Sequence, residues 1–213
     1  MNRPARLVAA VFTMSAVLLM SACGSGGGGD SGADKIKGAD QGASGRPSGS
    51  PSVGSEAARP TITLPESFRA DFEGWTNSDP KLQSILNDGK DRLRAGYAAI
   101  IAGNPQDGSL KFFSTDEALK SAPTWVETYE GLALKGRVRV FDPEVHISNE
   151  GFGVLFYCVD EARAFTRNTR TGRVEGTPEG DDPMVQYRTR LGRSADGVWQ
   201  TSTVETERGG CRK

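Results

Sequence analysis

The sequence predicts an α+β domain over residues 60–213, preceded by a signal peptide and a flexible linker. Two patterns predict this class. Apolar side chains recur at helical spacing over residues 79–102, whereas the chain after Lys135 has strand-like segments separated by turn residues. Helices followed by a meander of long antiparallel strands are typical of α+β proteins, in which the helices cover one face of a curved sheet. The segment has the size of one ordinary domain with its own core.

The first residues follow the pattern of a secretory signal peptide. Arg3 and Arg6 precede an uncharged apolar run over residues 7–19. This run is shorter than the about 20 apolar residues that a membrane-spanning helix needs. It ends in the sequence Leu-Leu-Met-Ser-Ala-Cys, in which medium and small residues precede Cys23, and Gly and Ser follow it. Cleavage after Ala22 would leave Cys23 as the first residue.

This segment resembles the signal peptides of bacterial lipoproteins, although Met20 stands where that family usually has leucine. The resemblance implies that residues 1–22 are removed and that Cys23 carries a thioether-linked diacylglyceryl group. Two acyl chains hold a protein stably on a membrane. We therefore expect a lipid anchor at Cys23 and a location on the cell membrane, facing outside the cytoplasm. A soluble secreted protein is the alternative.

Residues 23–59 consist mainly of Gly, Ser, Ala and Pro with scattered charges. Such a segment cannot bury enough apolar surface to offset the entropy that it would lose on ordering. It is predicted to be a flexible linker whose ends lie on the order of 30–35 Å apart. No strand pattern precedes the glycine run at residues 26–29 and no helix pattern follows it, so this run does not indicate a phosphate-binding loop.

The strongest helix signal covers residues 79–102. Asp79 can cap the first amide groups, Pro80 stands at the first helical position, and Gly103 can end the helix in the left-handed conformation. The apolar stripe comprises Leu82, Ile85, Leu86, Leu93, Tyr97, Ile100 and Ile101, and we expect Lys81, Asp88, Asp91, Arg92 and Arg94 to lie outside it.

A second helix is predicted to begin at residues 114–117, where Ser-Thr-Asp-Glu permits a capping box. Pro123 is expected to end or break it, with a further turn or two over residues 124–129. Strands are predicted over residues 135–147, 151–160, 162–169, 183–192 and 198–208.

The last two predicted strands form a hairpin around Asp196-Gly197, a favoured turn dipeptide. A two-residue loop there places Arg188 opposite Glu205. The same register puts apolar residues on one face, which we expect to be buried: Val185, Tyr187, Leu191, Val198 and Val204.

Residues 79–211 resemble the cone-shaped NTF2-like fold, in particular small lipoproteins of high-GC Gram-positive bacteria. The resemblance rests on the first helix, the strand ending at residues 156–160, the turn Thr171-Gly172, the segment Gly197-Val198-Trp199, and Cys211. It implies a cavity between helices and sheet. The family includes isomerases, cyclases and dehydratases that place an Asp, His or Tyr in that cavity.

After lipidation of Cys23, the remaining cysteines are Cys158 and Cys211. Disulfides persist outside the cytoplasm, so we expect a structural Cys158–Cys211 bridge; two free thiols are the alternative. The chain has no C-x-x-C motif, which argues against a redox role.

The weak candidates for a ligand-binding or catalytic group are Tyr157 and Asp160, with Glu161 beside them. A buried carboxylate and a tyrosine could act as a base and an oxyanion donor, but a strand end also explains these charges. His146 is the only histidine, which excludes a multi-histidine metal site. The acidic residues Glu179, Asp181 and Asp182 lack the pattern of a calcium loop, so no metal and no cofactor are expected.

Residues 60–213 carry 20 basic and 23 acidic residues, a balance that argues against nucleic acid as a partner. The leading hypothesis is a non-enzymatic binding or accessory module of the cell envelope. Its partner would be an envelope protein, a cell-wall polymer or a small apolar ligand. A cavity enzyme of the isomerase or dehydratase type and a passive structural protein are the alternatives.

Overall fold

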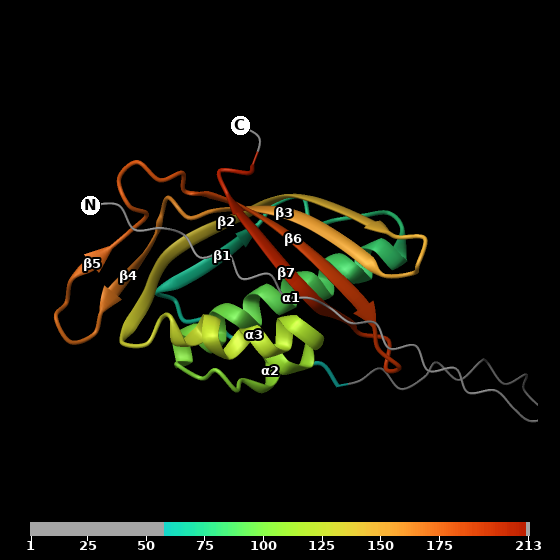
Figure 1. The fold of residues 1–213 in the computed structure, drawn as a ribbon, viewed down its shortest axis with the longest axis horizontal. Coiled ribbons are helices and arrows are strands. Elements are labelled where there is room, and N and C mark those ends of the chain that lie inside the picture. The colour runs from blue at the N-terminus through green and yellow to red at the C-terminus, as the bar shows by residue number, and fades with distance from the viewer. Residues whose placement is uncertain (1–57, 212–213) are drawn as a thin grey trace, which may run out of the picture. The chain divides into compact units, whose positions relative to one another are not determined.

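A computed structural model describes residues 58–211 of the chain; the predicted signal peptide, Cys23 and nearly all of the predicted linker lie outside this range. Figure 1 shows helices packed against one face of a curved sheet, so the predicted α+β class and its layered arrangement are confirmed. The elements are β1 (Phe68–Phe72), α1 (Pro80–Ala102), α2 (Gly108–Phe112), α3 (Asp116–Glu127), β2 (Leu132–Ile147), β3 (Gly153–Asp160), β4 (Ala164–Asn168), β5 (Val174–Glu175), β6 (Met184–Arg193) and β7 (Trp199–Arg208).

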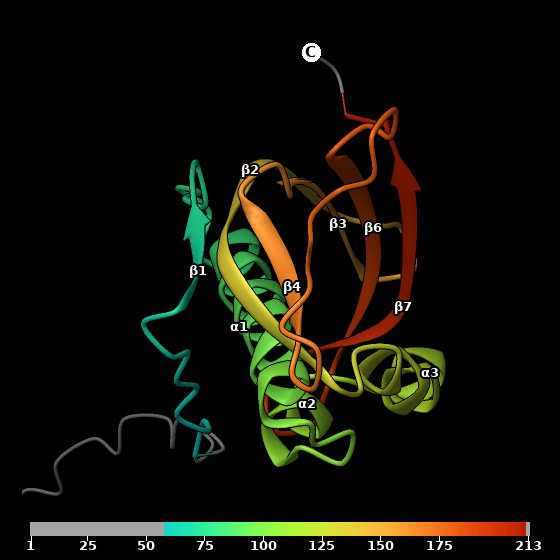
Figure 2. The ribbon, with the colours of Figure 1, turned by 90° about the vertical axis from the view of Figure 1, so that its left-hand side faces the viewer.

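The sheet has the strand order β5-β4-β2-β3-β6-β7, and β1 pairs with β2 in parallel. The long strand β2 connects the two parts of the sheet, because its first residues pair with β4 and its last with β3. The pairing with β3 shifts between Phe141 and Glu144, and Asp142 there has a φ of 49°. Such a bulge bends a strand and increases its twist. Figure 2 shows the resulting curvature around α1.

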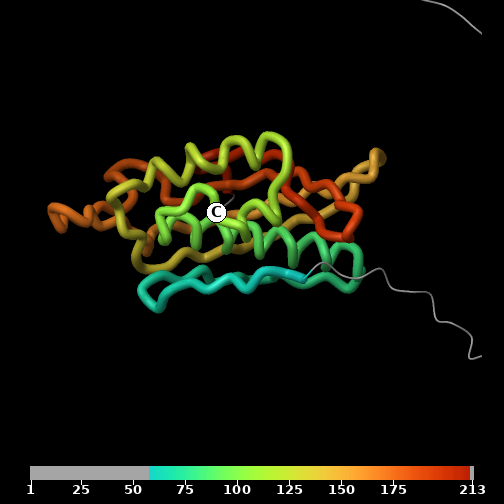
Figure 3. Tube along the Cα trace, turned by 90° about the horizontal axis from the view of Figure 1, so that it is seen from below, coloured from blue at the N-terminus to red at the C-terminus, as the bar shows by residue number. Residues whose placement is uncertain are grey.

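Helix α1 lies in the hollow of the sheet, with β1 at one side of the molecule and α3 at the other (Figure 3). Its ends are those predicted. The Asp79 carboxylate accepts hydrogen bonds from the amides of Lys81 and Leu82, at 2.7 and 3.3 Å, and Gly103 closes the helix with a φ of 60°. Two glycines allow close packing: a Cβ atom at Gly89 would lie 2.5 Å from Leu155, and one at Gly96 would lie 2.8 Å from Trp125.

Helix α1 is buried over more of its circumference than its apolar stripe predicted. Asp88 and Arg92, which we expected outside the stripe, are 0% and 6% exposed. The reason is that the curved sheet surrounds the helix: the start of β7 contacts one side at Asp88, and Trp125 of α3 packs near Arg92. The polar residues of α1 therefore include two that lie in the interior.

Helix α3 continues through Pro123, contrary to the predicted break. Its inner face buries Ala118, Ala122 and Val126, and this packing holds the helix together despite the backbone N–H that proline lacks. The capping box is also absent. Thr115 is the N-cap and makes no side-chain cap hydrogen bond, while the preceding Ser114 pairs with Thr201 of β7.

In the β6–β7 hairpin the predicted pair Arg188–Glu205 is present, but the two-residue loop is wrong. The register shifts by one residue between Arg190 and Leu191, so Arg193 pairs with Trp199. A hydrogen bond from the Ser194 amide to the Val198 carbonyl closes a longer loop.

Candidate ligand-binding site

The face of the sheet that packs on α1, here called the inner face, carries two stacked tyrosines. On β3, Leu155 packs against Gly89 of α1, so Tyr157 two residues on lies on the same side. Tyr157 is directly opposite Tyr187 of β6, and the two rings are parallel, with centroids 5.0 Å apart and 6° between their planes. The ring of Trp75 lies 5.4 Å from that of Tyr157. The inner face therefore presents flat aromatic surfaces that end in phenol hydroxyl groups.

Arg92 of α1 lies in this interior. It is four residues from Gly96, where Trp125 packs closely, and its guanidinium is 6.0 Å from the Trp125 ring. Its Nε atom is buried without a hydrogen-bond partner. Within residues 58–211, Arg92 makes no hydrogen bond and no ion pair. A buried charge that has an aromatic contact but no hydrogen bond or ion pair is costly, and this makes Arg92 a candidate for a functional role.

The electrostatics of this group follow from burial. Burial lowers the pKa of Arg92, although a guanidinium keeps its proton at neutral pH. Burial also raises the pKa of Tyr157 to about 12, an effect that the positive charge of Arg92 opposes. The pKa values of Tyr187 and Tyr97 are raised by burial as well. The interior thus holds one cation and neutral phenols, all of which can donate hydrogen bonds.

A pocket of about 180 Å³ opens at the β4 side of the sheet. Apolar side chains line part of it, among them Phe68, Leu134 and Val138. Tyr97 of α1 belongs both to this pocket and to the group of tyrosines whose charges would interact with Arg92. The pocket also contains Glu161 and Arg208, which form an ion pair at 3.0 Å.

The sequence-predicted candidates Tyr157 and Asp160 lie on opposite faces of the sheet. Tyr157 is 2% exposed on the inner face. Asp160 is on the outer face, where one carboxylate oxygen accepts from the Ala162 amide at 2.9 Å and the other lies 3.8 Å from Nε of Arg139. These two residues therefore do not form one site. His146 is exposed and stacks on Phe156.

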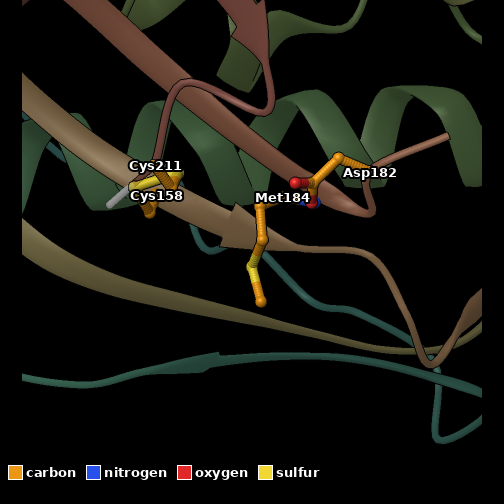
Figure 4. Close-up of a disulfide and its surroundings, with 4 residues drawn as sticks. All are labelled: Cys158, Asp182, Met184 and Cys211. Atoms are coloured by element: carbon orange, nitrogen blue, oxygen red, sulfur yellow. A yellow bond between two sulfur atoms is a disulfide. The ribbon is translucent and has the colours of Figure 1, made fainter. Parts of the chain in front are cut away.

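The disulfide between Cys158 and Cys211 is confirmed. It joins the outer face of β3 to the chain end after β7, as Figure 4 shows, and spans 53 residues of sequence. Phe141 and Met184 pack against it and form a small apolar cluster on the outer face. Cys23, the predicted lipidation site, lies outside the described residues.

Sequence reasoning missed Arg92 and gave Tyr97 only a packing role. The signal for Arg92 was its spacing, because it is seven residues after Ile85 and one before Leu93, both in the apolar stripe. Within residues 58–211, no cluster of three or more metal-ligating side chains occurs. The same residues include no helix long and apolar enough to cross a membrane.

No protein-family model matches the chain, and no curated protein matches it. Among solved structures, a protein from Catenulispora acidiphila is 12% identical with a TM-score of 0.42, covering 59% of this chain and 92% of its own. Aln2 from a Streptomyces species is 12% identical with a TM-score of 0.43, and the match covers 63% of this chain and 95% of Aln2. A putative ketosteroid isomerase from Shewanella frigidimarina is 13% identical with a TM-score of 0.32, and the match covers 64% of this chain and 99% of that protein. Similarity at this level does not transfer an activity.

Proposed function

We propose that this chain is a lipid-anchored, extracytoplasmic binding module that holds a small molecule between helix α1 and the inner face of the sheet. The observation that supports binding is the group formed by the buried residues Arg92, Tyr157 and Tyr97 with the partly buried Tyr187, next to a pocket with apolar walls. Pockets with apolar walls and a few converging polar groups are typical of small-molecule sites.

The arrangement favours binding over catalysis. A carboxylate acting as base beside a tyrosine that holds the oxyanion would have to lie close to these tyrosines. Asp160 lies on the outer face, and Asp88 is occupied by the backbone amide of Trp199 and by Arg59. A binding role requires only the donors and aromatic surfaces that the interior has.

A cavity enzyme of the isomerase or dehydratase type is the second candidate, and one observation favours it. Glu161 lines the same pocket as Tyr97, and its charge contributes to the raised pKa of Tyr97. As a base, however, Glu161 would have to leave its ion pair with Arg208. Binding therefore remains our leading proposal.

The membrane anchor is proposed from the resemblance of residues 1–23 to lipoprotein signal peptides. The composition of residues 23–59 supports a tether of a few tens of ångströms, which would keep the pocket accessible from outside the cell. An anchored binding module would retain its ligand at the cell surface.

A Cys23→Ala variant tests both parts of this proposal, because it removes the predicted acceptor of the lipid. We expect the wild-type protein in the membrane fraction and the variant in the medium or as uncut precursor. Correctly cut wild-type and variant proteins in the same membrane fraction would contradict the anchor.

Native mass spectrometry of the variant, purified from its host without reduction, is expected to show an added mass that is lost on unfolding. A bare mass, with no thermal shift across a panel of small molecules, would contradict the binding role.

A further inference from the structure

We propose that the interior site takes a small organic carboxylate, with its anionic group on Arg92 and the tyrosine hydroxyls and its apolar body towards Tyr97 and the pocket. This inference rests on the proposed binding function and specifies its ligand class. Three features of the described residues carry it: the charge of Arg92, which has no ion-pair partner, the neutral hydrogen-bond donors whose charges would interact with it, and the size of the pocket that Tyr97 lines.

The first feature is the charge itself. Arg92 is 6% exposed, and no aspartate or glutamate within residues 58–211 forms an ion pair with it. Asp88 lies one helical turn away, but one of its carboxylate oxygens accepts from the Trp199 amide at 2.8 Å and the other from Arg59. The anion in the interior that could neutralise Arg92 is thus already used to join α1 to β7. An anionic ligand would supply the missing charge.

The second feature is the donor chemistry around Arg92. The hydroxyls of Tyr157, Tyr187 and Tyr97 make no hydrogen bond within residues 58–211. With its planar fork of N–H donors, a guanidinium matches the two oxygens of a carboxylate better than it matches any neutral group. Neutral phenols beside it add further donors. A carboxylate ligand would bring the negative charge that Arg92 lacks and acceptor oxygens for these hydroxyls.

The third feature limits the size of the ligand. The pocket next to Tyr97 has a volume of about 180 Å³ and apolar walls at Phe68, Leu134 and Val138. An apolar cavity of about 150 Å³ is large enough to bind benzene. The proposed ligand is therefore a carboxylate whose body is about the size of one ring, rather than a long acyl chain or a polymer.

The test compares two probes of nearly equal shape, 3-phenylpropionate and 3-phenylpropionamide, by titration calorimetry with the folded, disulfide-bonded chain. We expect the carboxylate to bind wild-type protein at least about tenfold more tightly than the amide, as is typical of hydrogen bonds to a charged group. Arg92→Met removes the guanidinium and keeps an unbranched apolar chain in place of the arginine stem. It should lose about tenfold or more in affinity for the carboxylate and leave the affinity for the amide unchanged.

Thermal unfolding separates this role from a structural one. Because the charge of Arg92 is buried and unpaired, Arg92→Met should unfold at the same or a higher temperature than wild type. Arg94→Met is the matched control on the same helix, since Arg94 is partly exposed and donates to the Ile62 carbonyl at 2.8 Å. It should leave the preference for the carboxylate intact. Arg92→Lys keeps the positive charge but lacks the planar pair of N–H donors, so it should bind the carboxylate with intermediate affinity. This variant replaces Arg92→Met in the test if Arg92→Met does not fold.

Equal affinity of the two probes for wild-type protein, or a preference that survives in Arg92→Met, would overturn the carboxylate assignment while leaving the binding role in place. Failure of both probes to bind, together with an added native mass, would likewise overturn only the ligand class. Failure of both probes with a bare native mass would overturn the binding role as well.

Discussion

Cys158 and Cys211 form the one covalent link between distant parts of the described domain. The bridge closes a long segment that contains β4, β5, β6 and β7, so its effect on the unfolded chain is large. For a separation of 53 residues, the chain-entropy model gives about 4 kcal/mol, and native disulfides typically contribute about 2–4 kcal/mol.

Cys211→Ser is therefore expected to lower the free energy of unfolding by about 2–4 kcal/mol, as measured by urea denaturation. Reduced wild-type protein should lose a similar amount, whereas reductant should not affect the variant. An oxidised wild type no more stable than the variant would show that the bridge does not stabilise the domain.

Some single residues could be assigned correctly from the sequence, whereas others could not. The disulfide was predictable because only two cysteines remain after Cys23 and disulfides persist in the compartment that the signal sequence predicts. Arg92 was assigned to the polar side of α1, because a charged residue beside an apolar stripe normally faces solvent. Arg92 is buried because α3 and the curved sheet cover the part of α1 that lies beside the apolar stripe. The periodicity of a single helix does not reveal such a covering.

At the scale of elements, the contact between α1 and the start of β7 holds the hollow of the sheet around the helix. The carboxylate of Asp88 accepts from the Trp199 amide at 2.8 Å, and the indole N–H of Trp199 donates to Oγ of Ser84 at 3.0 Å. Arg59, which precedes the first strand, also forms an ion pair with Asp88. Three segments far apart in sequence thus meet at one carboxylate that is 0% exposed.

We expect Asp88→Ala to lower the free energy of unfolding by about 3–5 kcal/mol, because it leaves the buried Trp199 amide without its acceptor and removes the ion pair with Arg59. Ser84→Ala should cost about 1–2 kcal/mol, since at a partly exposed position it removes the acceptor of the Trp199 indole and a local hydrogen bond to the Lys81 carbonyl. Asp91→Ala, on the same helix and partly exposed, is the control and should change stability by less than about 0.5 kcal/mol. Equal losses for Asp88→Ala and Asp91→Ala would contradict a specific role of this contact.

Long elements were predicted better than short ones. Helix α1 and strands β2, β3, β6 and β7 contain enough residues for their periodicity to be recognised. Strand β1 and helix α2 have five residues each and β5 has two, and none of them was predicted, whereas the equally short β4 lies within the strand predicted over residues 162–169. Pro123 was misleading for a different reason: tertiary packing of α3 outweighed its local preference for breaking a helix.

At the scale of the whole molecule, the candidate site draws on α1, β3 and β6, which are separated by long stretches of sequence. Tyr157 and Tyr187 become neighbours through the register of two strands, and the charge of Arg92 interacts with theirs only because α1 lies in the hollow of the sheet. The sequence therefore indicated the fold and one member of the site, Tyr157. Its assembly required strand register and helix placement, which local patterns do not determine.

The four buried or partly buried tyrosines have a consequence for the whole domain at alkaline pH. Burial raises the pKa values of Tyr97, Tyr129, Tyr157 and Tyr187 above the ordinary value of about 10. Between about pH 10 and the higher pKa of the folded state, the unfolded chain releases protons that the folded domain keeps. The stability contributed by these groups is therefore complete below about pH 10 and is lost as the pH rises further.

For Tyr157, whose pKa is raised to about 12, this loss amounts to about 2–3 kcal/mol once the pH exceeds that value. We expect the free energy of urea unfolding to fall steeply above about pH 10, and tyrosinate absorbance to appear together with unfolding rather than before it. Tyr157→Phe removes one of these groups while keeping the stacked ring, so its decline should be shallower than that of wild type. Tyrosinate absorbance for all four tyrosines in the still-folded domain near pH 10 would contradict their burial and, with it, the enclosed interior in which Arg92 lies.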